Sequence, residues 1–477
     1  MAKAKTAQSK VLIVAKRDDP KIWVPLGESF EKLGYTPVFA FYQYSKDHEK
    51  YANELRFEDQ EAVEYEKIII KVNKTTLETV KKEVNLEEEI PRFEKEYSIH
   101  SMRFFCLTEF INYNKTYEEV LLEALVTERV IKPYILKEKQ LKFIVHSQGT
   151  EILRSVIHVI GRAKKIPNIY FDNSWFMDRI FLQSNQMNLL DEYRPIPYNK
   201  IGKNDLKLIK EIKDGISQHK KRYVYFIEKK KDVFSLAYTY LLSSKYKRQS
   251  RRLLREFYSK YTLNFKSFLK NFYINKIIGK KLKKDDKYFY FPIHYVFDSQ
   301  ITYRAQLFFR QEYLMEYIAW NLPHGYKLYV KLHPGVKREE TFQFINFVKD
   351  LDNVVLLKSN TNSHHILEDE NCKAVITINS SVGFESLMYN KPVITLGKFY
   401  GIHHEKTIIN ILPEELRETL TSVLQYKYTE KDFLAALYSI YNATYEGTFY
   451  PLIDDPDVLA ASLIEKYEFM IKNKILY

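Results

Sequence analysis

Short apolar runs alternate with amphipathic segments along the first part of this chain. Apolar runs that predict buried strands lie at Ser9–Asp19, Thr36–Tyr42, Lys67–Val72, Leu141–Thr150 and Ile166–Trp175. Segments with the periodicity of helices follow or separate them, at Trp23–Leu33, Thr116–Ile131 and Ile152–Ala163. Such alternation is typical of a doubly wound domain with a parallel sheet. We therefore expect a first Rossmann-like domain over residues 1–200.

The same rhythm returns in the last part of the chain. Strands are predicted at Tyr288–Phe291, Lys327–Leu332, Val354–Leu357, Ala374–Ile378 and Pro392–Leu396. Helices are predicted at Ala305–Asn321, Glu340–Asp350, Ser363–Asp369, Val382–Tyr389 and Lys431–Tyr445. This pattern predicts a second Rossmann-like domain over residues 287–450. A closing helix at Asp457–Lys472, within residues 451–477, has the length to cross back onto the first domain.

The segment between the two domains has a different character. Residues 201–286 read as a helical insertion or connector, with helices expected at Asn204–His219, Lys230–Leu242 and Lys247–Phe272. The whole chain carries a net charge of +13, but Lys220–Lys287 holds 21 Lys and Arg against 5 Asp and Glu, a local charge of +16. The basic character therefore belongs to one segment. This segment is either a solvated insertion or a surface that binds an anionic partner.

Length, cysteines and apolar runs set the outer limits. A chain of 477 residues is too long for a single core, which agrees with two domains. The two cysteines, Cys106 and Cys372, form neither a disulfide framework nor a zinc-binding spacing, so a reducing cytoplasmic compartment is expected. No run approaches the roughly 20 apolar residues of a membrane-spanning helix. We expect a protein that is soluble or bound at the inner face of a membrane.

A hydroxyl-rich turn between a predicted strand and helix is the first candidate for chemistry. In VITINSSVGFESLMYNKPVI, Ser380 and Ser381 stand where the helix begins, with Gly383 and Glu385 in its first turns. Free N–H groups at a helix N-terminus favour an anion. The serines add donors, and Gly383 would let a ligand approach closely. The turn thus predicts a phosphate site, although two serines in this position are also ordinary helix caps.

A second candidate follows the strand in GYKLYVKLHPG. Pro334 ends the strand and forces a turn, which should place His333 at the edge of the sheet. A histidine there can donate to a phosphate oxygen or protonate a leaving group. Its alternative is a structural residue at a strand end. Because the Ser380–Ser381 turn should lie at the same edge, a shared anion site is favoured.

These motifs, together with FPIHYVFDSQITYR, resemble the capsule polysaccharide biosynthesis family, GT-B enzymes that include bacterial β-Kdo transferases. The His-Pro and Ser-Ser pairs are also similar to those of bacterial sialyltransferases, which use CMP-activated sugars. The resemblance implies a nucleotide phosphate at His333 and the serine turn. It also implies that Asp298 is the nucleophile of a double displacement, unless it only caps a turn. On the same segment, either Arg304 or Arg310 could hold the carboxylate of an acidic sugar, unless each is a surface residue.

The acceptor side departs from the pattern of the family. Many members have an acidic residue directly before the glycine that ends an N-domain strand, whereas this chain has His146-Ser147-Gln148-Gly149-Thr150-Glu151. Glu151 could supply the acid from a shifted position, and His146 could act as a base. Asp172, near the end of the next strand, is a weaker candidate.

The leading hypothesis is therefore a GT-B glycosyltransferase that moves Kdo or another sugar from a CMP- or UDP-activated donor to a surface polysaccharide or glycolipid. A nucleotide-sugar 2-epimerase of similar fold is the alternative, and a nucleic-acid-binding protein ranks last because no readout motif is present. The donor is a substrate, and no cofactor is expected. A metal is also not expected, since Asp350–Asp352 and Asp455–Asp457 lie away from the predicted site. Lys220–Lys287 would hold the enzyme at an anionic membrane.

Overall fold

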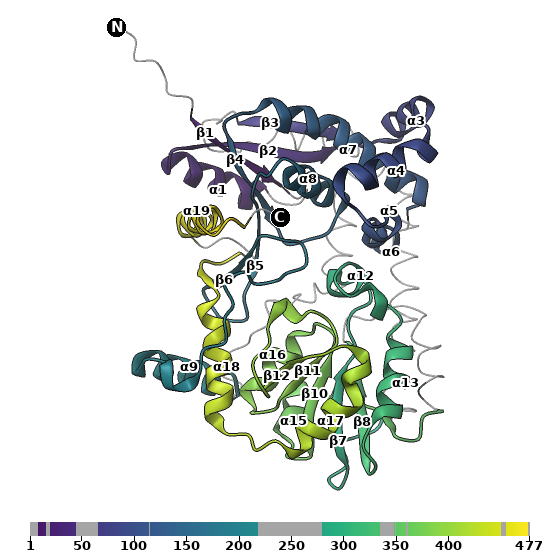
Figure 1. The fold of residues 1–477 in the computed structure, drawn as a ribbon, viewed down its shortest axis with the longest axis vertical. Helices are drawn as coiled ribbons and strands as arrows, with labels where there is room; N and C mark the ends of the chain where they lie inside the picture. The colour runs from purple at the N-terminus through teal and green to yellow at the C-terminus, as the bar shows by residue number, and fades with distance from the viewer. Residues whose placement is uncertain are drawn as a thin grey trace, which may run out of the picture.

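Two α/β domains stand one above the other (Figure 1). The computed structural model describes residues 8–15, 20–43, 65–113, 115–217, 279–333, 348, 350–358, 361–449 and 455–475. Each domain is built around one sheet of mainly or wholly parallel strands with helices on its faces. The prediction of two Rossmann-like domains in a GT-B arrangement is confirmed.

The first domain contains a seven-stranded sheet in the order β13-β6-β5-β4-β1-β2-β3. Its strands are β1 (Ser9–Val14), β2 (Tyr35–Gln43), β3 (Glu66–Lys71), β4 (Leu141–Ser147), β5 (Asn168–Asn173), β6 (Arg179–Gln183) and β13 (Tyr445–Glu446). The first five run parallel, whereas β6 and β13 are antiparallel to their neighbours. The carboxyl ends of β4 and β5 therefore meet at one edge of the sheet.

Both faces of this sheet are buried, which explains why its central strands are continuously apolar. In β1, Val11 and Ile13 point into one core, and Leu12 and Val14 point into the other. The helices of the domain are α1 (Pro20–Lys32), α3 (Lys74–Glu83), α4 (Leu86–Tyr97), α5 (Met102–Phe105), α6 (Leu107–Tyr113), α7 (Tyr117–Lys137) and α8 (Ile152–Ala163). Helices α7 and α8 contribute to the core on the face opposite α1.

The second domain has a six-stranded parallel sheet in the order β12-β11-β10-β7-β8-β9. Its strands are β7 (Lys287–Pro292), β8 (Tyr326–Lys331), β9 (Val354–Leu356), β10 (Cys372–Thr377), β11 (Val393–Thr395) and β12 (Ile408–Asn410). Its α-helices are α12 (Ser299–Thr302), α13 (Gln311–Asn321), α15 (Ser363–Glu368), α16 (Ser381–Met388), α17 (Leu416–Gln425) and α18 (Glu430–Asn442). Short 3₁₀ turns include η4 (Gln306–Phe308), η5 (Phe399–Gly401) and η6 (Pro413–Glu415).

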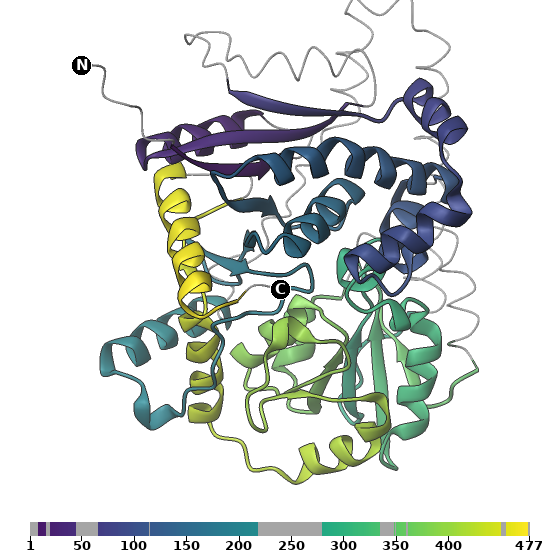
Figure 2. The same cartoon turned by 45° about the horizontal axis from the view of Figure 1, so that its top comes forward.

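The chain crosses back to the first domain near its end. Helix α19 (Pro456–Lys472) packs against α1, as Figure 2 shows for the yellow helix. Leu459, Ala460 and Leu463 are fully buried in the core beneath α1, because this face of the sheet would otherwise be open. The predicted return of the closing helix is confirmed. The return starts earlier than the expected boundary at residue 450, since β13 already pairs with β6.

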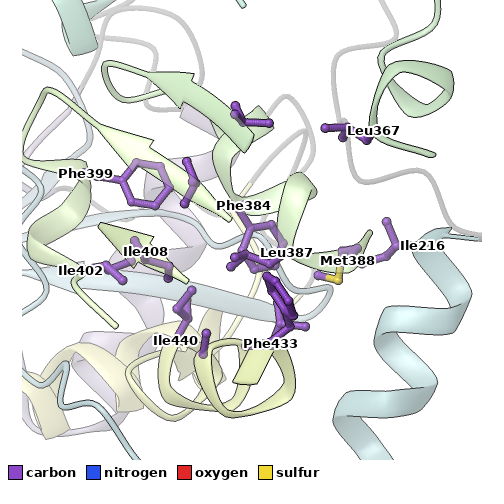
Figure 3. Packing of buried hydrophobic residues seen from close by; sticks show 14 of the residues in the cluster. Ile216, Leu367, Phe384, Leu387, Met388, Phe399, Ile402, Ile408, Phe433 and Ile440 are labelled. Carbon is purple, nitrogen blue, oxygen red and sulfur yellow. The ribbon is translucent and has the colours of Figure 1, made fainter. Parts of the chain in front are cut away.

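The described part of the insertion packs on the second domain. Helix α9 (Lys203–Ser217) follows the 3₁₀ turn η1 (Tyr198–Lys200) and contacts α18 and α16. Figure 3 shows Ile216 of α9 reaching toward Met388 of α16. The helices expected at residues 230–242 and 247–272 lie outside the described residues, as does nearly all of the one at 340–350. Within the described part of the chain, no helix has the length and apolarity to cross a membrane.

One predicted helix differs at its start. The sequence predicts a helix over Ala305–Asn321, but a 3₁₀ turn covers Gln306–Phe308 and the α-helix begins at Gln311. The reason lies in contacts with distant parts of the chain. The Gln306 side chain donates to the carbonyl oxygen of Phe104 in the first domain (2.7 Å), and the Gln311 side chain bonds to the backbone of His294. These contacts outweigh local helix propensity.

Candidate active site

Asp298 lies beyond the carboxyl end of β7, on the side of the second domain that faces the first. Its side chain caps α12 by accepting a hydrogen bond from the backbone N–H of Gln300 (2.9 Å), and it is exposed. Four residues later, the Thr302 hydroxyl lies 3.1 Å from that of Thr108 in α6 of the first domain. The capping role foreseen as an alternative is real, but it leaves the carboxylate accessible at the junction of the two domains.

Arg304 is buried in the same junction. Its Nε donates to the backbone oxygen of Gln186 (2.9 Å) and its Nη1 to the hydroxyl of Ser299 (2.7 Å). Among the described residues, Nη2 has no hydrogen-bond partner. Burial lowers the pKa of the guanidinium, whereas Tyr400, Asp298 and Asp172 raise it. The alternative of a surface arginine is therefore wrong: this is a buried cation with one donor group to offer to an anion.

Tyr400, which sequence reasoning missed, completes the junction on the second-domain side. Tyr400 in η5 accepts a hydrogen bond from Nε2 of Gln300 (3.2 Å), and its backbone oxygen accepts one from the N–H of Leu190. The backbone φ of Tyr400 is +58°, which a tyrosine rarely adopts. Burial raises the pKa of the phenol, so it stays protonated at neutral pH. The unusual backbone conformation of Tyr400 is visible only in the structure, and no sequence motif reveals it.

Two histidines follow β7 and β8. His333 is exposed, and its ring lies 5.8 Å from that of Tyr295. Desolvation by neighbouring atoms lowers the pKa of His333. The nearby charge of Asp298 raises this pKa, and that of Lys331 lowers it. His294, by contrast, is fully enclosed, and burial lowers its pKa to about 3. The neutral His294 ring accepts the backbone N–H of Asn379 through Nε2 (3.1 Å).

Asn379 links these segments directly before the serine turn. Its side chain accepts the N–H of Phe399 (2.8 Å) and donates to the backbone oxygen of Gln300 (3.3 Å). It therefore fixes the loop after β10 to both α12 and the turn that carries Tyr400. His294 and Asn379 thus hold in place the loops that carry the candidate site residues. The FPIH and TINSS motifs contained them, but their side chains gave no separate signal.

The serine turn has the predicted place at the start of α16. The hydroxyl of Ser380 accepts the N–H of Val382 (3.3 Å), and Ser381 is exposed. The helix-cap alternative thus holds for Ser380, and it is compatible with an anion at the remaining N–H groups. Gly383 needs a correction. A Cβ there would lie 3.0 Å from Val393 and 3.1 Å from Phe399, so core packing, not the approach of a ligand, requires glycine.

Glu385, which is partly exposed, and the buried Lys331 lie behind that turn. Burial raises the pKa of Glu385, and the nearby Lys331 ammonium lowers it. Lys331, which the sequence analysis did not single out, is itself buried at the end of β8 and lies 3.3 Å from the hydroxyl of Ser363. Tyr290 shares that hydroxyl at 3.3 Å. These groups can bind hydroxyls and carbonyls of a nucleoside.

Two acceptor-side candidates lie elsewhere than expected. His146 is in the core of the first domain, fully buried, stacked on Tyr170 and bonded through Nε2 to Asn168 (2.9 Å). A group without access to the junction cannot take a proton from an acceptor, so the base role proposed for His146 is wrong. Glu151 stands at the N-cap position of α8, but its side chain makes no cap hydrogen bond and instead forms an ion pair with Arg154. On the donor side, Pro334 of the His-Pro pair lies outside the described residues.

Asp172 is the acceptor-side candidate that reaches the junction. It is partly exposed at the end of β5, and its Oδ1 accepts the N–H of Asn173 (2.9 Å). Burial raises its pKa to about 6, Arg304 lowers it, and the charge of Asp298 raises it again. Asp172 from the first domain and Asp298, Arg304 and Tyr400 from the second thus share one electrostatic environment.

A phosphate-binding metal has no obvious ligands here. Over the described ranges, no three side chains of His, Cys, Asp or Glu come together as metal ligands would. Asp455 caps α19, and Asp457 bonds to Ser29 and forms an ion pair with Lys32 of α1. The second Asp-x-Asp pair therefore stabilises the contact between α19 and the first domain, away from the junction.

Comparisons with known proteins found one family model and several solved structures that are similar to this chain. Residues 207–407 match the family model described as capsule polysaccharide biosynthesis protein, whereas no curated protein sequence matches. Two similar solved structures are Thermosulfurimonas dismutans KpsC modules, a beta Kdo 2,4 transferase (13% identity, 63% of this chain and 80% of that one, TM-score 0.35) and a beta Kdo 2,7 transferase (11%, 71% and 89%, 0.36). A third is UDP-GlcNAc 2-epimerase from Neisseria meningitidis (10%, 97% and 100%, 0.30).

The family match spans the elements that carry the site. It includes Asp298, Arg304, His333 and the Ser380–Ser381 turn, and it ends just beyond Tyr400. Residues 207–407 are thus similar to the capsule polysaccharide biosynthesis protein family, and the two facing Rossmann-like domains of this chain have the GT-B arrangement.

Proposed function

We propose that this protein is a glycosyltransferase of capsule biosynthesis that transfers an acidic sugar, Kdo or a relative, from a CMP- or UDP-activated donor to a surface polysaccharide or glycolipid. One observation carries the proposal. An accessible carboxylate, Asp298, lies at a domain junction beside the buried Arg304 guanidinium, whose Nη2 has no hydrogen-bond partner among the described residues. A carboxylate-bearing sugar would satisfy that donor with charge-assisted hydrogen bonds.

The donor would lie along the carboxyl edge of the second sheet. The N-terminus of α16, with Ser380 and Ser381, would hold the phosphate, and His333 would donate to it or to the leaving oxygen. The nucleoside would reach Glu385 and Lys331, which lie close enough for their opposite charges to shift each other's pKa. This orientation places the sugar toward the first domain and next to Asp298.

Two displacements complete the transfer. The Asp298 carboxylate attacks the anomeric carbon, and the bond from that carbon to the phosphate oxygen breaks, with its electron pair leaving on the nucleotide. The resulting glycosyl ester is then attacked by an acceptor hydroxyl, which returns the electron pair to Asp298. Two inversions give net retention of configuration.

We further propose that the enzyme is held at an anionic membrane surface through Lys220–Lys287. The segment has a local charge of +16, and within its described end Lys280, Lys281, Lys283 and Lys284 are all exposed. Exposed lysines near anionic lipid each contribute about 1 kcal/mol. Lipid-linked acceptors assembled at a membrane would then meet the enzyme there.

A panel of radiolabelled sugar nucleotides tests the function. Incubation with CMP-Kdo, CMP-sialic acid and UDP-N-acetylglucosamine, with and without glycan acceptors, should give transfer or slow donor hydrolysis with one CMP or UDP sugar. An isomerised sugar nucleotide would instead identify a 2-epimerase. Absence of any turnover, combined with tight oligonucleotide binding, would overturn the enzymatic proposal.

A further inference from the structure

Asp172 enters the domain junction because the β5–β6 hairpin docks on the second domain. Its cross-strand partner in the antiparallel pair is Phe181, whose ring centroid lies 5.3 Å from that of Tyr400. Trp175, three residues after Asp172, lies edge-on to Tyr400 at 4.9 Å and stacks on Phe384 at 4.7 Å. Aromatic contacts on both strands therefore hold Asp172 against the wall of the junction that Tyr400 forms.

The groups that face Asp172 come from two elements of the second domain. Asp298, the N-cap of α12, and Arg304, which follows this helix, shift the pKa of Asp172 in opposite directions, and Asp172 in turn affects the pKa of Tyr400 in η5. From its own segment, the backbone N–H of Asn173 donates a hydrogen bond to its Oδ1. Two carboxylates thus face one junction from opposite domains, one exposed on the donor side and one partly enclosed on the acceptor side.

We propose that Asp172 is the general base that takes the proton of the acceptor hydroxyl during the second displacement. The inference rests on the transfer proposed above. The acceptor oxygen forms a bond to the anomeric carbon, the bond from that carbon to the Asp298 oxygen breaks, and the electron pair returns to the Asp298 carboxylate. The hydroxyl proton passes to Asp172, so that no other reactant is needed.

The alternatives within the first domain are less suitable. His146 is fully buried and stacked on Tyr170, one strand away, and cannot reach an acceptor. Glu151 is held by Arg154, which also donates to the Ser147 hydroxyl. Asp172, whose pKa burial raises to about 6, is mostly ionised at neutral pH and still basic enough to accept a proton.

The test compares Asp172→Asn with Asp178→Asn in the full chain. Asn173 can still donate to an asparagine oxygen, so the loop should keep its shape. Asp178 undergoes the same chemical change on the same hairpin, but it is exposed, and its φ of +58° suits asparagine. Transfer is measured from pH 5 to 9 with the active donor of the panel, alongside calorimetric binding of CMP and UDP and the melting temperature.

We expect Asp172→Asn to lose transfer by about 100-fold or more at unchanged nucleotide affinity and melting temperature. The wild type should lose activity below about pH 6, where Asp172 becomes protonated, and the variant should lack this acid limb. Azide, which attacks without giving up a proton, should restore consumption of donor by Asp172→Asn.

Each other outcome has one meaning. Transfer by Asp172→Asn at the rate and pH dependence of Asp178→Asn overturns the role of Asp172 and leaves the proposed function intact. If Asp172→Asn loses activity but azide does not restore the consumption of donor, the role of Asp172 is also overturned and the proposed function stays intact. A wild type that consumes no sugar nucleotide overturns the proposed function, and this inference with it.

Discussion

Replacing Lys466 by methionine should loosen the contact between the closing helix and the rest of the protein. The Lys466 side chain is fully buried in α19. Its Nζ donates to Asp191 Oδ2 (2.7 Å) and to both oxygens of Glu192 (2.7 and 2.8 Å). Both carboxylates belong to the segment that leads from the first domain toward the second. The Lys466 ammonium thus links helix α19, which returns to the first domain, to the segment that leaves that domain.

The expected cost follows from the charges left behind. Asp191 and Glu192 are 3% and 15% exposed, so removing the cation leaves two carboxylates largely out of water. Breaking a buried ion pair from one side costs about 3–5 kcal/mol. For a unit of about 200 residues, where 1 kcal/mol shifts the melting temperature by about 2–4 °C, this corresponds to a drop of roughly 6–20 °C.

Scanning calorimetry of three variants measures this cost. Lys472→Met, an exposed lysine in the last turn of the same helix, is the matched control and should change the free energy of unfolding by about 0.5 kcal/mol at most. Adding Asp191→Asn and Glu192→Gln to Lys466→Met should restore much of the loss. The amides still accept the hydrogen bonds from Ser184 and Tyr445 but need no counter-charge. If Lys466→Met melts with the control, the reasoning about buried charge is refuted.

Three further predictions concern the chemistry and the membrane. Asp298→Ala should abolish transfer and leave the binding of CMP or UDP intact. His333→Ala should instead weaken nucleotide binding, as measured by calorimetry. Near-normal turnover by Asp298→Ala would contradict the assignment of Asp298 as nucleophile. Activity should be unchanged in EDTA, because the α16 N-terminus and His333 meet the phosphate charge, and a strict Mg²⁺ requirement would argue against this. In co-sedimentation, the protein should bind anionic but not neutral liposomes, less so at high salt or with Lys280→Glu and Lys281→Glu; failure with both vesicle types would end the membrane proposal.

Most of the fold could be predicted from the sequence because short stretches of the chain determine most of its helices and strands. Helix α8 was predicted at its observed bounds, and β7, β8 and β10 within one or two residues at each end. Apolar runs bounded by polar turns leave few choices for a parallel strand. The same patterns put His333 and the Ser380–Ser381 turn at the carboxyl edge of one sheet, since parallel strands end on the same side.

The acceptor-side candidates of the first domain could not be ranked from the sequence alone. His146 and Asp172 are both polar residues near the ends of adjacent parallel strands, and spacing alone does not separate them. The structure encloses His146 between Tyr170 and Asn168 and brings Asp172 to Tyr400, more than 200 residues further along the chain. Which side chain faces the junction depends on how the β5–β6 hairpin meets the second domain.

The sequence by itself determined the central parallel strands of both sheets, most of the helices, and the edge at which His333 and the Ser380–Ser381 turn lie, but it did not predict β6, β12 or β13. Only the tertiary structure decided that Arg304 is buried, since its partner is the backbone of Gln186, and that Gly383 serves packing against Phe399. It also decided where α13 begins, through the contact of Gln306 with Phe104. The physical reason is common to all three. Periodicity records which faces of an element are apolar, whereas burial and charge at a domain junction depend on residues that meet only after the chain has folded.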